Sequence, residues 1–126
     1  MSGQNGNQLT TETERTMHLF HRAFDRHDAE ALVDLVAEDC VIEDTSPVPN
    51  GLRHVGKNAC LMVWQRLIRA PGTWFTREEV STSGDRAVVR WRYHWGDGDS
   101  QSIRGVNLMR VRDGQVVEAM GYVKCG

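Results

Sequence analysis

The first part of the chain carries hydrophobic residues at helical spacing. Met17, Phe20 and Phe24 recur three and four residues apart, so they lie on one face of a predicted helix. The T-x-x-E sequence from Thr11 to Glu14 matches a capping box, and we expect this helix to begin there. The pattern breaks near the sequence DRHD, where the helix is predicted to end.

Two further helices and one strand are predicted before the chain reaches Pro71 and Gly72. Asp28 is placed to cap a second, shorter helix, and a third begins near Lys57 and stops before the Pro-Gly pair. Between them, CVIED has the β-branched composition of a short strand, and TSPVPNGLRHVG reads as a loop from its Pro, Asn and Gly content. The buried stripes of the two helices are Ala31, Leu32, Leu35 and Val36, and Leu61, Trp64, Leu67 and Ile68.

After residue 72 the hydrophobic period changes from that of a helix to the two-residue period of a strand. Four strands are predicted, and short turns at SGD, GDGDS and DG join each of them to the next. Helices followed by a run of hairpins indicate an α+β domain, in which a curved antiparallel sheet has its concave face covered by helices. The four strands read TWFTREEVST, RAVVRWRYHW, QSIRGVNLMRVR and QVVEAMGYVK.

Length and charge narrow the class of protein. A chain of 126 residues fits one domain, so we expect a polar, glycine-rich, disordered lead-in at residues 1–9 and a single domain at 10–126. The net charge is -2, with basic residues scattered among acids, which disfavours nucleic acid or an acidic membrane as partner. No apolar run approaches the roughly 20 residues of a membrane span.

The chain has three cysteines, Cys40, Cys60 and Cys125, which are far apart. This odd number and wide spacing favour a reducing cytoplasm over a disulfide framework.

Two stretches resemble a known superfamily. FDRHDAEALVDLVAEDCVIED is similar to the paired helices and first strand of the nuclear transport factor 2-like (NTF2-like) and SnoaL-like proteins. GDRAVVRWRY, followed by IRGVNLMRVRDGQVVEAMGYV, is similar to the hairpin and last two strands, and its R-G-V-x-x-x-R-V-R-D-G-x-V-x-E pattern is the more specific part. The resemblance covers about residues 12–124 and implies a cone-shaped α+β fold, with a mixed or antiparallel sheet curved around three helices. The superfamily includes ketosteroid isomerase, limonene epoxide hydrolase and polyketide cyclases, and also simple binding proteins, so the function needs its own argument.

Asp44 ends the CVIED strand and is the first candidate for chemistry. Strand alternation places Cys40, Ile42 and Asp44 on one face, so Asp44 faces the interior if Ile42 does. A partly desolvated carboxylate there is suited to act as a general base. The resemblance implies the same role, because ketosteroid isomerase has its base at the end of this strand in a V-E-D sequence. The alternative is that Asp44 only caps the following loop, bonding to backbone N–H groups near Thr45 and Ser46.

Asn107 is the second candidate. In the isomerase a protonated aspartic acid occupies the matching position and donates a hydrogen bond to the developing oxyanion. An asparagine keeps a donor at this place without needing a proton on a carboxylate, and it could polarise a carbonyl group. The alternative is an asparagine satisfied by neighbouring backbone or water.

The sequence also departs from the catalytic patterns of the resembled enzymes. Phe20 aligns with the phenolic donor of the isomerase and cannot donate. Polyketide cyclases often have H-W-D on the last strand, where this chain has Ala119, Met120 and Gly121, and Gly121 also stands where epoxide hydrolases carry an acid. Only an isomerase-like pair of Asp44 and Asn107 survives the comparison.

The composition of the cavity depends on which face of RAVVRWRYHW points inward. If Arg90, Arg92 and His94 do, the cavity is cationic; if Trp91, Tyr93 and Trp95 do, it is aromatic. Burying unpaired arginines is costly, so we expect the aromatic face inside and the other face on the convex side, where this superfamily commonly dimerises. Core or cavity positions are expected for Met17 and Met62. The expected pocket residues are Phe20, Phe24, Trp64, Trp91, Tyr93, Met109 and Tyr122.

Histidine spacing gives little support for a metal. His18 and His21 are three residues apart on the first helix, but no third ligand is evident, so half-buried or surface histidines are the better reading. No cofactor is implied either. We therefore expect a cytoplasmic homodimer that binds a small hydrophobic molecule and acts as an isomerase-like enzyme on a carbonyl compound. The alternatives are a non-catalytic protein that binds a small ligand, and a dimeric interaction module.

Overall fold

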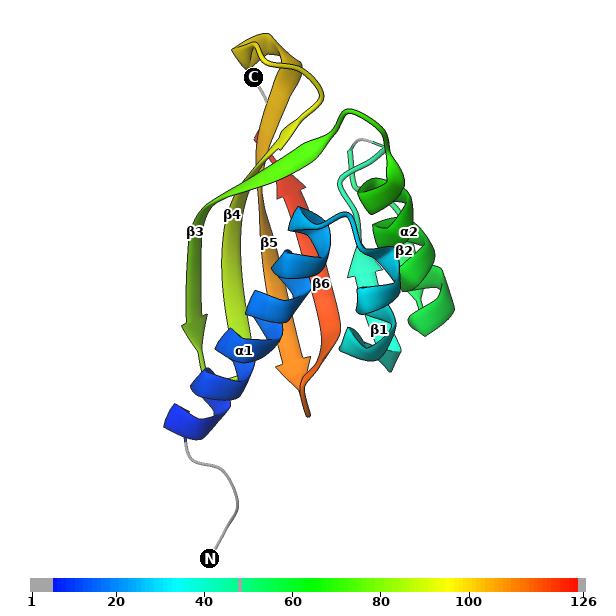
Figure 1. Ribbon diagram of the computed structural model, residues 1–126. Coiled ribbons are helices and arrows are strands. Elements are labelled where there is room, and N and C mark those ends of the chain that lie inside the picture. The colour runs from blue at the N-terminus through cyan, green and yellow to red at the C-terminus, as the bar shows by residue number, and fades with distance from the viewer. Residues whose placement is uncertain (1–5, 48, 125–126) are drawn as a thin grey trace, which may run out of the picture.

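A curved six-stranded sheet carries the helices on its concave side (Figure 1). The computed structural model describes residues 6–47 and 49–124. The strand order is β2-β1-β6-β5-β4-β3, and every neighbouring pair is antiparallel except β1 with β6, so the sheet is mixed. This confirms the predicted α+β cone. The elements are α1 (Gly6–Asp25), η1 (Ala29–Leu35), β1 (Val36–Glu43), β2 (Arg53–Val55), α2 (Lys57–Arg69), β3 (Trp74–Ser83), β4 (Arg86–His94), η2 (Asp99–Gln101), β5 (Ser102–Arg112) and β6 (Gln115–Val123).

Helix α1 begins earlier than its sequence pattern indicated. It starts at Gly6, so residues 6–9 of the expected lead-in are helical, and residues 1–5 lie outside the described part. The capping-box prediction is wrong, because Thr11 lies within the helix and its hydroxyl donates to the carbonyl of Asn7 at 2.9 Å. The hydroxyl of buried Thr13 instead donates to the carbonyl of Gly84 at 2.7 Å, which ties the helix to the β3–β4 turn.

The next two helices form where they were predicted, but in the first of them Ala31 is exposed, and buried Val36 already belongs to β1. Asp28 caps the second, accepting a hydrogen bond from the backbone N–H of Ala31 at 3.2 Å, although this element is a 3-10 helix rather than an α-helix. Helix α2 ends before Pro71 as expected. It buries Cys60, Leu61, Trp64 and Ile68 against β1 and the rest of the core.

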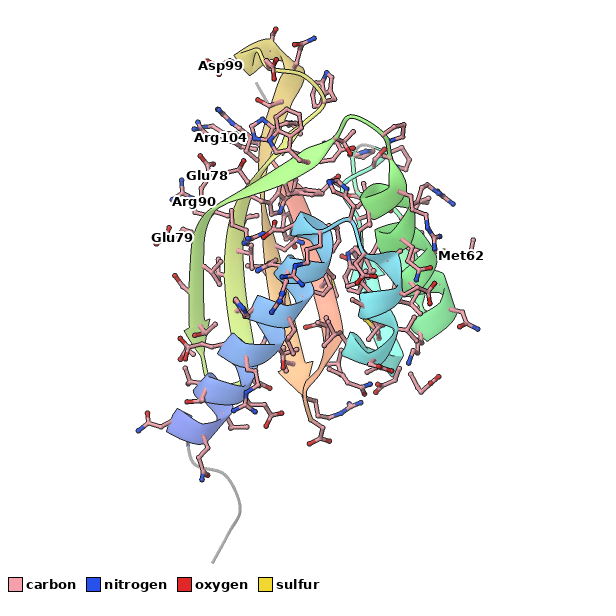
Figure 2. The ribbon with its side chains drawn as sticks, viewed as in Figure 1. Met62, Glu78, Glu79, Arg90, Asp99 and Arg104 are labelled. Carbon is pink, nitrogen blue, oxygen red and sulfur yellow. The ribbon has the colours of Figure 1, made fainter. Side chains whose placement is uncertain are left out.

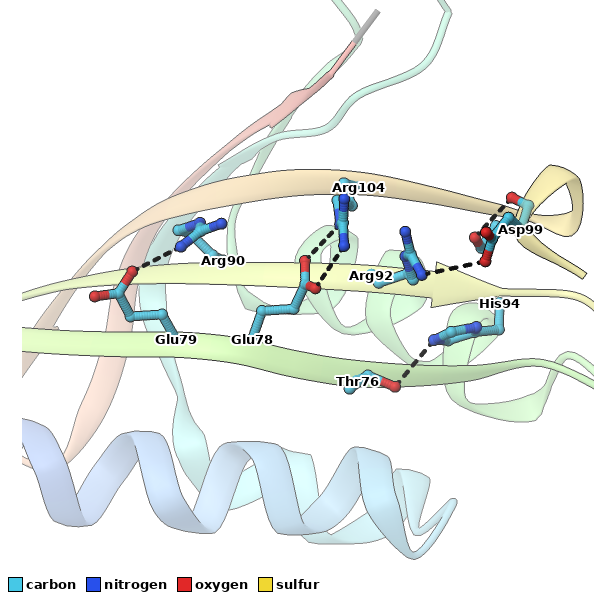
Figure 3. Close-up of polar contacts among 9 residues, drawn as sticks. Thr76, Glu78, Glu79, Arg90, Arg92, His94, Asp99 and Arg104 are labelled. Atoms are coloured by element: carbon cyan, nitrogen blue, oxygen red, sulfur yellow. Dashed lines mark hydrogen bonds and ion pairs between the residues drawn. The ribbon is translucent and has the colours of Figure 1, made fainter. Parts of the chain in front are cut away.

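A β-bulge in β3 determines which side chains face the cavity. Arg77 pairs with Trp91 and Glu79 pairs with Arg90, so Glu78 is the extra residue. Before the bulge, Phe75 and Arg77 face the concave side. Glu78 and Glu79 then both turn to the convex side, where they meet Arg104 and Arg90 (Figure 3).

Strand β4 presents its aromatic residues to the concave side. Val89 and Trp91 are buried and Tyr93 is half-buried, whereas Arg90 and Arg92 carry ion pairs on the convex face. Trp95 lies beyond the end of the strand and is exposed. The short helix η2 overlaps the end of the predicted GDGDS turn and includes Gln101, which was predicted to begin the next strand.

The two described cysteines lie in the core. Cys40 and Cys60 are fully buried as free thiols, and burial raises the pKa of each above its usual value. Cys125 lies outside the described residues. Within residues 6–47 and 49–124, no helix is both long and apolar enough to cross a membrane.

Candidate functional site

A cavity of about 630 Å³ lies between the concave face of the sheet and helices α1 and α2. Aromatic side chains from both helices and from β3 and β4 form much of its wall. Neighbouring rings meet edge to face, such as Phe20 with Trp64, whose centroids are 4.9 Å apart, and Phe75 with Trp91 at 5.6 Å. The aromatic lining residues are Phe20, Phe24, Trp64, Phe75, Trp91 and Tyr93.

Two of the expected pocket residues, Met109 and Tyr122, do not line the cavity. Met62, which was expected in the core or the cavity, is in neither. Met109 is buried in the core but does not line the cavity, because it lies two residues beyond Asn107, the last residue of β5 in the cavity wall. Tyr122 is exposed, because it pairs with Val106 on the convex side of the sheet. Met62 is exposed on the outer side of α2 (Figure 2).

Asp44 lines the cavity and is also held by the loop that follows it. Its Oδ1 atom accepts a hydrogen bond from the backbone N–H of Leu52 at 2.9 Å. Its Oδ2 atom lies 2.9 Å from Nε2 of His54. A carboxylate can only accept, so the ring N–H of His54 is the donor. The carboxylate thus holds the loop and also lines the cavity, but its backbone partner is Leu52 and not a residue near Thr45 and Ser46, where the capping alternative placed it.

His54 is the residue of this site that the sequence did not single out. It lies on β2, a three-residue strand inside the segment that was expected to be a loop. β2 pairs antiparallel with β1 so that His54 is opposite Ile42, which brings its ring to Asp44. The sequence LRHV just before Gly56 does not alternate apolar and polar residues, and it spans too few residues to separate a strand from a loop.

Gly51 allows the loop to close against Asp44. Its φ is +70°, a conformation that favours glycine. A Cβ atom added there would lie 1.8 Å from the carbonyl oxygen of Asp44. The backbone of this loop therefore fits around Asp44 only with glycine at position 51.

Asn107 lines the same cavity, and its amide orientation follows from one neighbour. The indole N–H of Trp91 donates to its Oδ1 atom at 3.1 Å. Because an indole N–H can only donate, the amide oxygen must face Trp91. The NH₂ group then has no hydrogen-bond partner within the described chain, and it remains available to a ligand.

Gly121 packs closely against Asn107 and the loop after β1. The two residues are paired across β5 and β6. A Cβ on Gly121 would lie 3.1 Å from Oδ1 of Asn107 and 3.2 Å from Thr45. A carboxyl side chain here would crowd both neighbours.

The opposite wall carries a second polar group that the sequence did not indicate. Arg77 of β3 lines the cavity and forms a two-pronged ion pair with Asp25 of α1, with Nη1 at 2.9 Å from Oδ1. The hydrogen bonds from Arg77 hold the pKa of Asp25 below its usual value. His21 lies beside them on the wall, and burial, with a smaller effect of the Arg77 charge, lowers its pKa to about 4. His21 is therefore neutral at pH 7.

The spacing of His18 and His21 does not extend into a cluster of potential metal ligands. Among residues 6–47 and 49–124, no three His, Cys, Asp or Glu side chains are grouped to hold a metal ion.

Comparison with known proteins bears on the fold and the family. The family model described as "SnoaL-like domain" matches residues 17–119. An NTF2-like protein of unknown function from Mesorhizobium loti is 48% identical over 98% of both chains, with a TM-score of 0.87. No curated protein matches the sequence.

Two more distant structures share the fold. A candidate ketosteroid isomerase from Kribbella flavida is 22% identical over 93% of this chain and 81% of its own, with a TM-score of 0.76. A candidate polyketide cyclase from Sinorhizobium meliloti is 23% identical over 85% of this chain and 93% of its own, with a TM-score of 0.69. At these identities the likeness extends to the fold alone.

Proposed function

Because the chain belongs to the SnoaL-like family, whose fold surrounds a cavity, we propose that it is an isomerase-like enzyme acting on a hydrophobic carbonyl compound. The observation that carries the proposal is that Asp44 and Asn107 line one cavity. Proton transfer next to a carbonyl needs a base near the carbon and a donor near the oxygen. The chain supplies one of each.

Asp44 is the proposed general base. Its carboxylate removes a proton from the carbon next to the carbonyl, and the C–H electron pair moves into an enolate. The NH₂ group of Asn107 donates to the developing oxyanion. The Asp44 carboxyl then returns the proton to another carbon of the substrate, so that no cofactor is consumed. The bond from His54 holds the carboxylate in one orientation during these steps.

The wall of the cavity supports an apolar substrate. Aromatic rings make up much of it, and a volume of about 630 Å³ is within the range of small-molecule sites. Two buried free thiols agree with a reducing compartment, so we also propose that the protein works in the cytoplasm.

The test is Asp44→Asn on a substrate found by screening unsaturated ketones, polyketide-like aldehydes and epoxides. We expect turnover to fall by about 10²-fold or more, the usual effect of removing a general base. Asp39→Asn is the matched control, because Asp39 is an exposed acid of β1, the strand that Asp44 follows, and it pairs with Arg112. Equal rates for Asp44→Asn and the wild type would place the base elsewhere.

A non-catalytic binding protein is the second candidate. Both oxygens of Asp44 already accept hydrogen bonds, and Phe20 supplies no second donor beside Asn107. If no carbonyl compound turns over while an apolar ligand raises the melting temperature, this second function is the correct one.

A further inference from the structure

Arg77 is a charged group on a wall made largely of aromatic rings. Its side chain is 29% exposed, and it lines the cavity between Phe75 and the turns of α1 that carry His21 and Phe24. The bulge after Arg77 ends the inward-facing alternation of β3, so Arg77 is the last residue before Glu78 and Glu79 turn outward. The two glutamates pair with arginines on the convex face, while Arg77 alone is directed to the cavity.

The pair with Asp25 leaves Arg77 with unused hydrogen-bonding capacity. A guanidinium group carries five N–H donors in a planar fork. Asp25 takes one from Nη1 and one from Nη2. The other three have no partner within residues 6–47 and 49–124. Asp25 does not line the cavity, so a ligand inside it meets the guanidinium of Arg77 and not the Asp25 carboxylate.

His21 adds a polar contact at the same place without adding charge. Burial and the nearby Arg77 hold its pKa near 4, so the ring is neutral at pH 7 and offers one donor and one acceptor. Neither ring nitrogen has a hydrogen-bond partner in the described part of the chain. This wall therefore combines one cation with several free N–H donors inside an otherwise apolar cavity.

We propose that the substrate of this cavity is an apolar molecule that carries a carboxylate group, and that Arg77 anchors this group. The inference rests on the proposed function only in taking the cavity as the substrate site. Planar two-pronged contact is the usual mode by which arginine binds carboxylates. His21 supplies a further donor to the same group.

The position of Asp44 sets the direction of the bound molecule. Strands β6, β5 and β4 lie between β1, which Asp44 follows, and β3, which carries Arg77. The two side chains are on opposite sides of the cavity, at most about 19 Å apart along the sheet at roughly 4.8 Å per strand. Repulsion by Asp44 and attraction by Arg77 both direct the substrate carboxylate to β3. The carbonyl group of the substrate then lies toward Asp44 and Asn107.

The test compares two probes of the same shape, 1-naphthylacetate and 1-naphthylacetamide, by isothermal titration calorimetry at pH 7.5. We expect the wild type to bind the carboxylate about tenfold more tightly than the amide, as for one charge-assisted contact. Arg77→Gln should bring the two affinities to within about twofold. Arg90→Gln is the matched control, because Arg90 is an ion-paired arginine of the convex face, and its preference should equal that of the wild type.

Asp25→Asn provides an independent test, in which the preference for the carboxylate probe should change in the opposite direction. It removes the internal counter-ion and keeps the guanidinium, so the preference for the carboxylate should rise. If the ion pair only tethers α1 to β3, this variant lowers the melting temperature and leaves the preference unchanged. The variant also keeps the inference falsifiable if Arg77→Gln does not fold.

The inference is overturned if neither probe binds, if the wild type shows no preference, or if the preference survives in Arg77→Gln. Its failure is distinct from failure of the proposed catalysis, because the readout is binding. A carboxylate preference without turnover of any carbonyl compound would contradict the catalysis and support this inference. Turnover of a carbonyl compound without a carboxylate preference would support the proposed catalysis and contradict this inference.

Discussion

At the level of single residues, three polar side chains on the cavity wall are each held by a partner. Trp91, the partner of Asn107, also lines the cavity, whereas His54, the partner of Asp44, does not. A side chain fixed in this way loses less conformational entropy when it meets a ligand. The pairs are Asp44 with His54, Asn107 with Trp91, and Arg77 with Asp25.

His21 makes the stability of the fold depend on pH. Its pKa is about 4 in the folded protein and about 6.5 in the unfolded chain. Between these values the unfolded chain binds the proton and the folded protein does not, so protons favour unfolding. The contribution of His21 to stability is complete above pH 6.5 and decreases as the pH falls toward 4. The loss at pH 4 is at most about 3 kcal/mol.

Urea unfolding at pH 7.0 and pH 4.5 measures this effect. The free energy of unfolding of the wild type should fall more between the two pH values than that of His21→Gln, which has no proton to bind at this position. His18→Gln serves as control, because His18 is an exposed residue of the same helix. An equal fall in His21→Gln and the wild type would show that His21 titrates normally in the folded protein.

At the level of elements, the loop between β1 and β2 positions Asp44. The backbone N–H of Asp44 donates to the carbonyl of Leu52 at 3.0 Å, and its carboxylate accepts from the N–H of the same residue. Gly51 lies against the Asp44 carbonyl. The loop and the carboxylate therefore move together.

Gly51→Ala should displace this loop. A methyl group at this position meets the Asp44 carbonyl at 1.8 Å and also forces a side chain into a positive φ. Gly72→Ala is a close control, since its φ is +72° and nothing lies within 4 Å of an added Cβ. We expect a loss of about 1 kcal/mol for Gly72→Ala and about 2 to 3 kcal/mol or more for Gly51→Ala in urea unfolding. Equal losses would mean that the loop relaxes without cost.

Some elements were predictable and others were not, for definable reasons. The four strands after residue 72 have a clear two-residue period, so the sequence predicted them. The cap at Asp28 was predicted as well, because it depends only on neighbouring residues. The start of α1 was missed because its first turns are polar and exposed, which gives no period to detect. Strict alternation would also place Glu79 on the same face as Arg77. The bulge that reverses this is not visible in the sequence.

The candidate site was only partly predictable, because it depends on long-range pairing. β1 lies parallel beside β6, which lies beside β5. Because of this order, Asp44 and Asn107 line the same cavity. The resemblance to a family named Asp44 and Asn107 as candidates, but no local pattern in the sequence specified this strand order. His54 and Arg77 depend on the registers of β2 and β3, which no local pattern determines. Their contacts with Asp44 and Asp25 became evident only in the folded chain.

At the level of the whole molecule, the convex face of the sheet carries exposed apolar residues beside ion pairs. Val88 and Leu108 are adjacent on β4 and β5, and each is about two-fifths exposed, at 41% and 42%. Tyr122 of β6 extends the patch at 54% exposure. Glu79 with Arg90 and Glu78 with Arg104 lie alongside it (Figure 3). A patch of this kind on the sheet is suited to a second copy of the chain, and we propose a homodimer through this face.

Light scattering after gel filtration tests the dimer. At high micromolar concentration the wild type should have twice the 14.3 kDa mass of one chain. Leu108→Glu should give the single-chain mass, because association would bury a charged carboxylate where the wild type buries an apolar side chain. Met62→Glu is the control, because Met62 is at least as exposed but lies on α2, away from the convex face (Figure 2). A wild-type mass of 14.3 kDa would refute the dimer and leave the convex face as solvent-exposed surface. A dimer that persists in Leu108→Glu would place the interface on another part of the molecule.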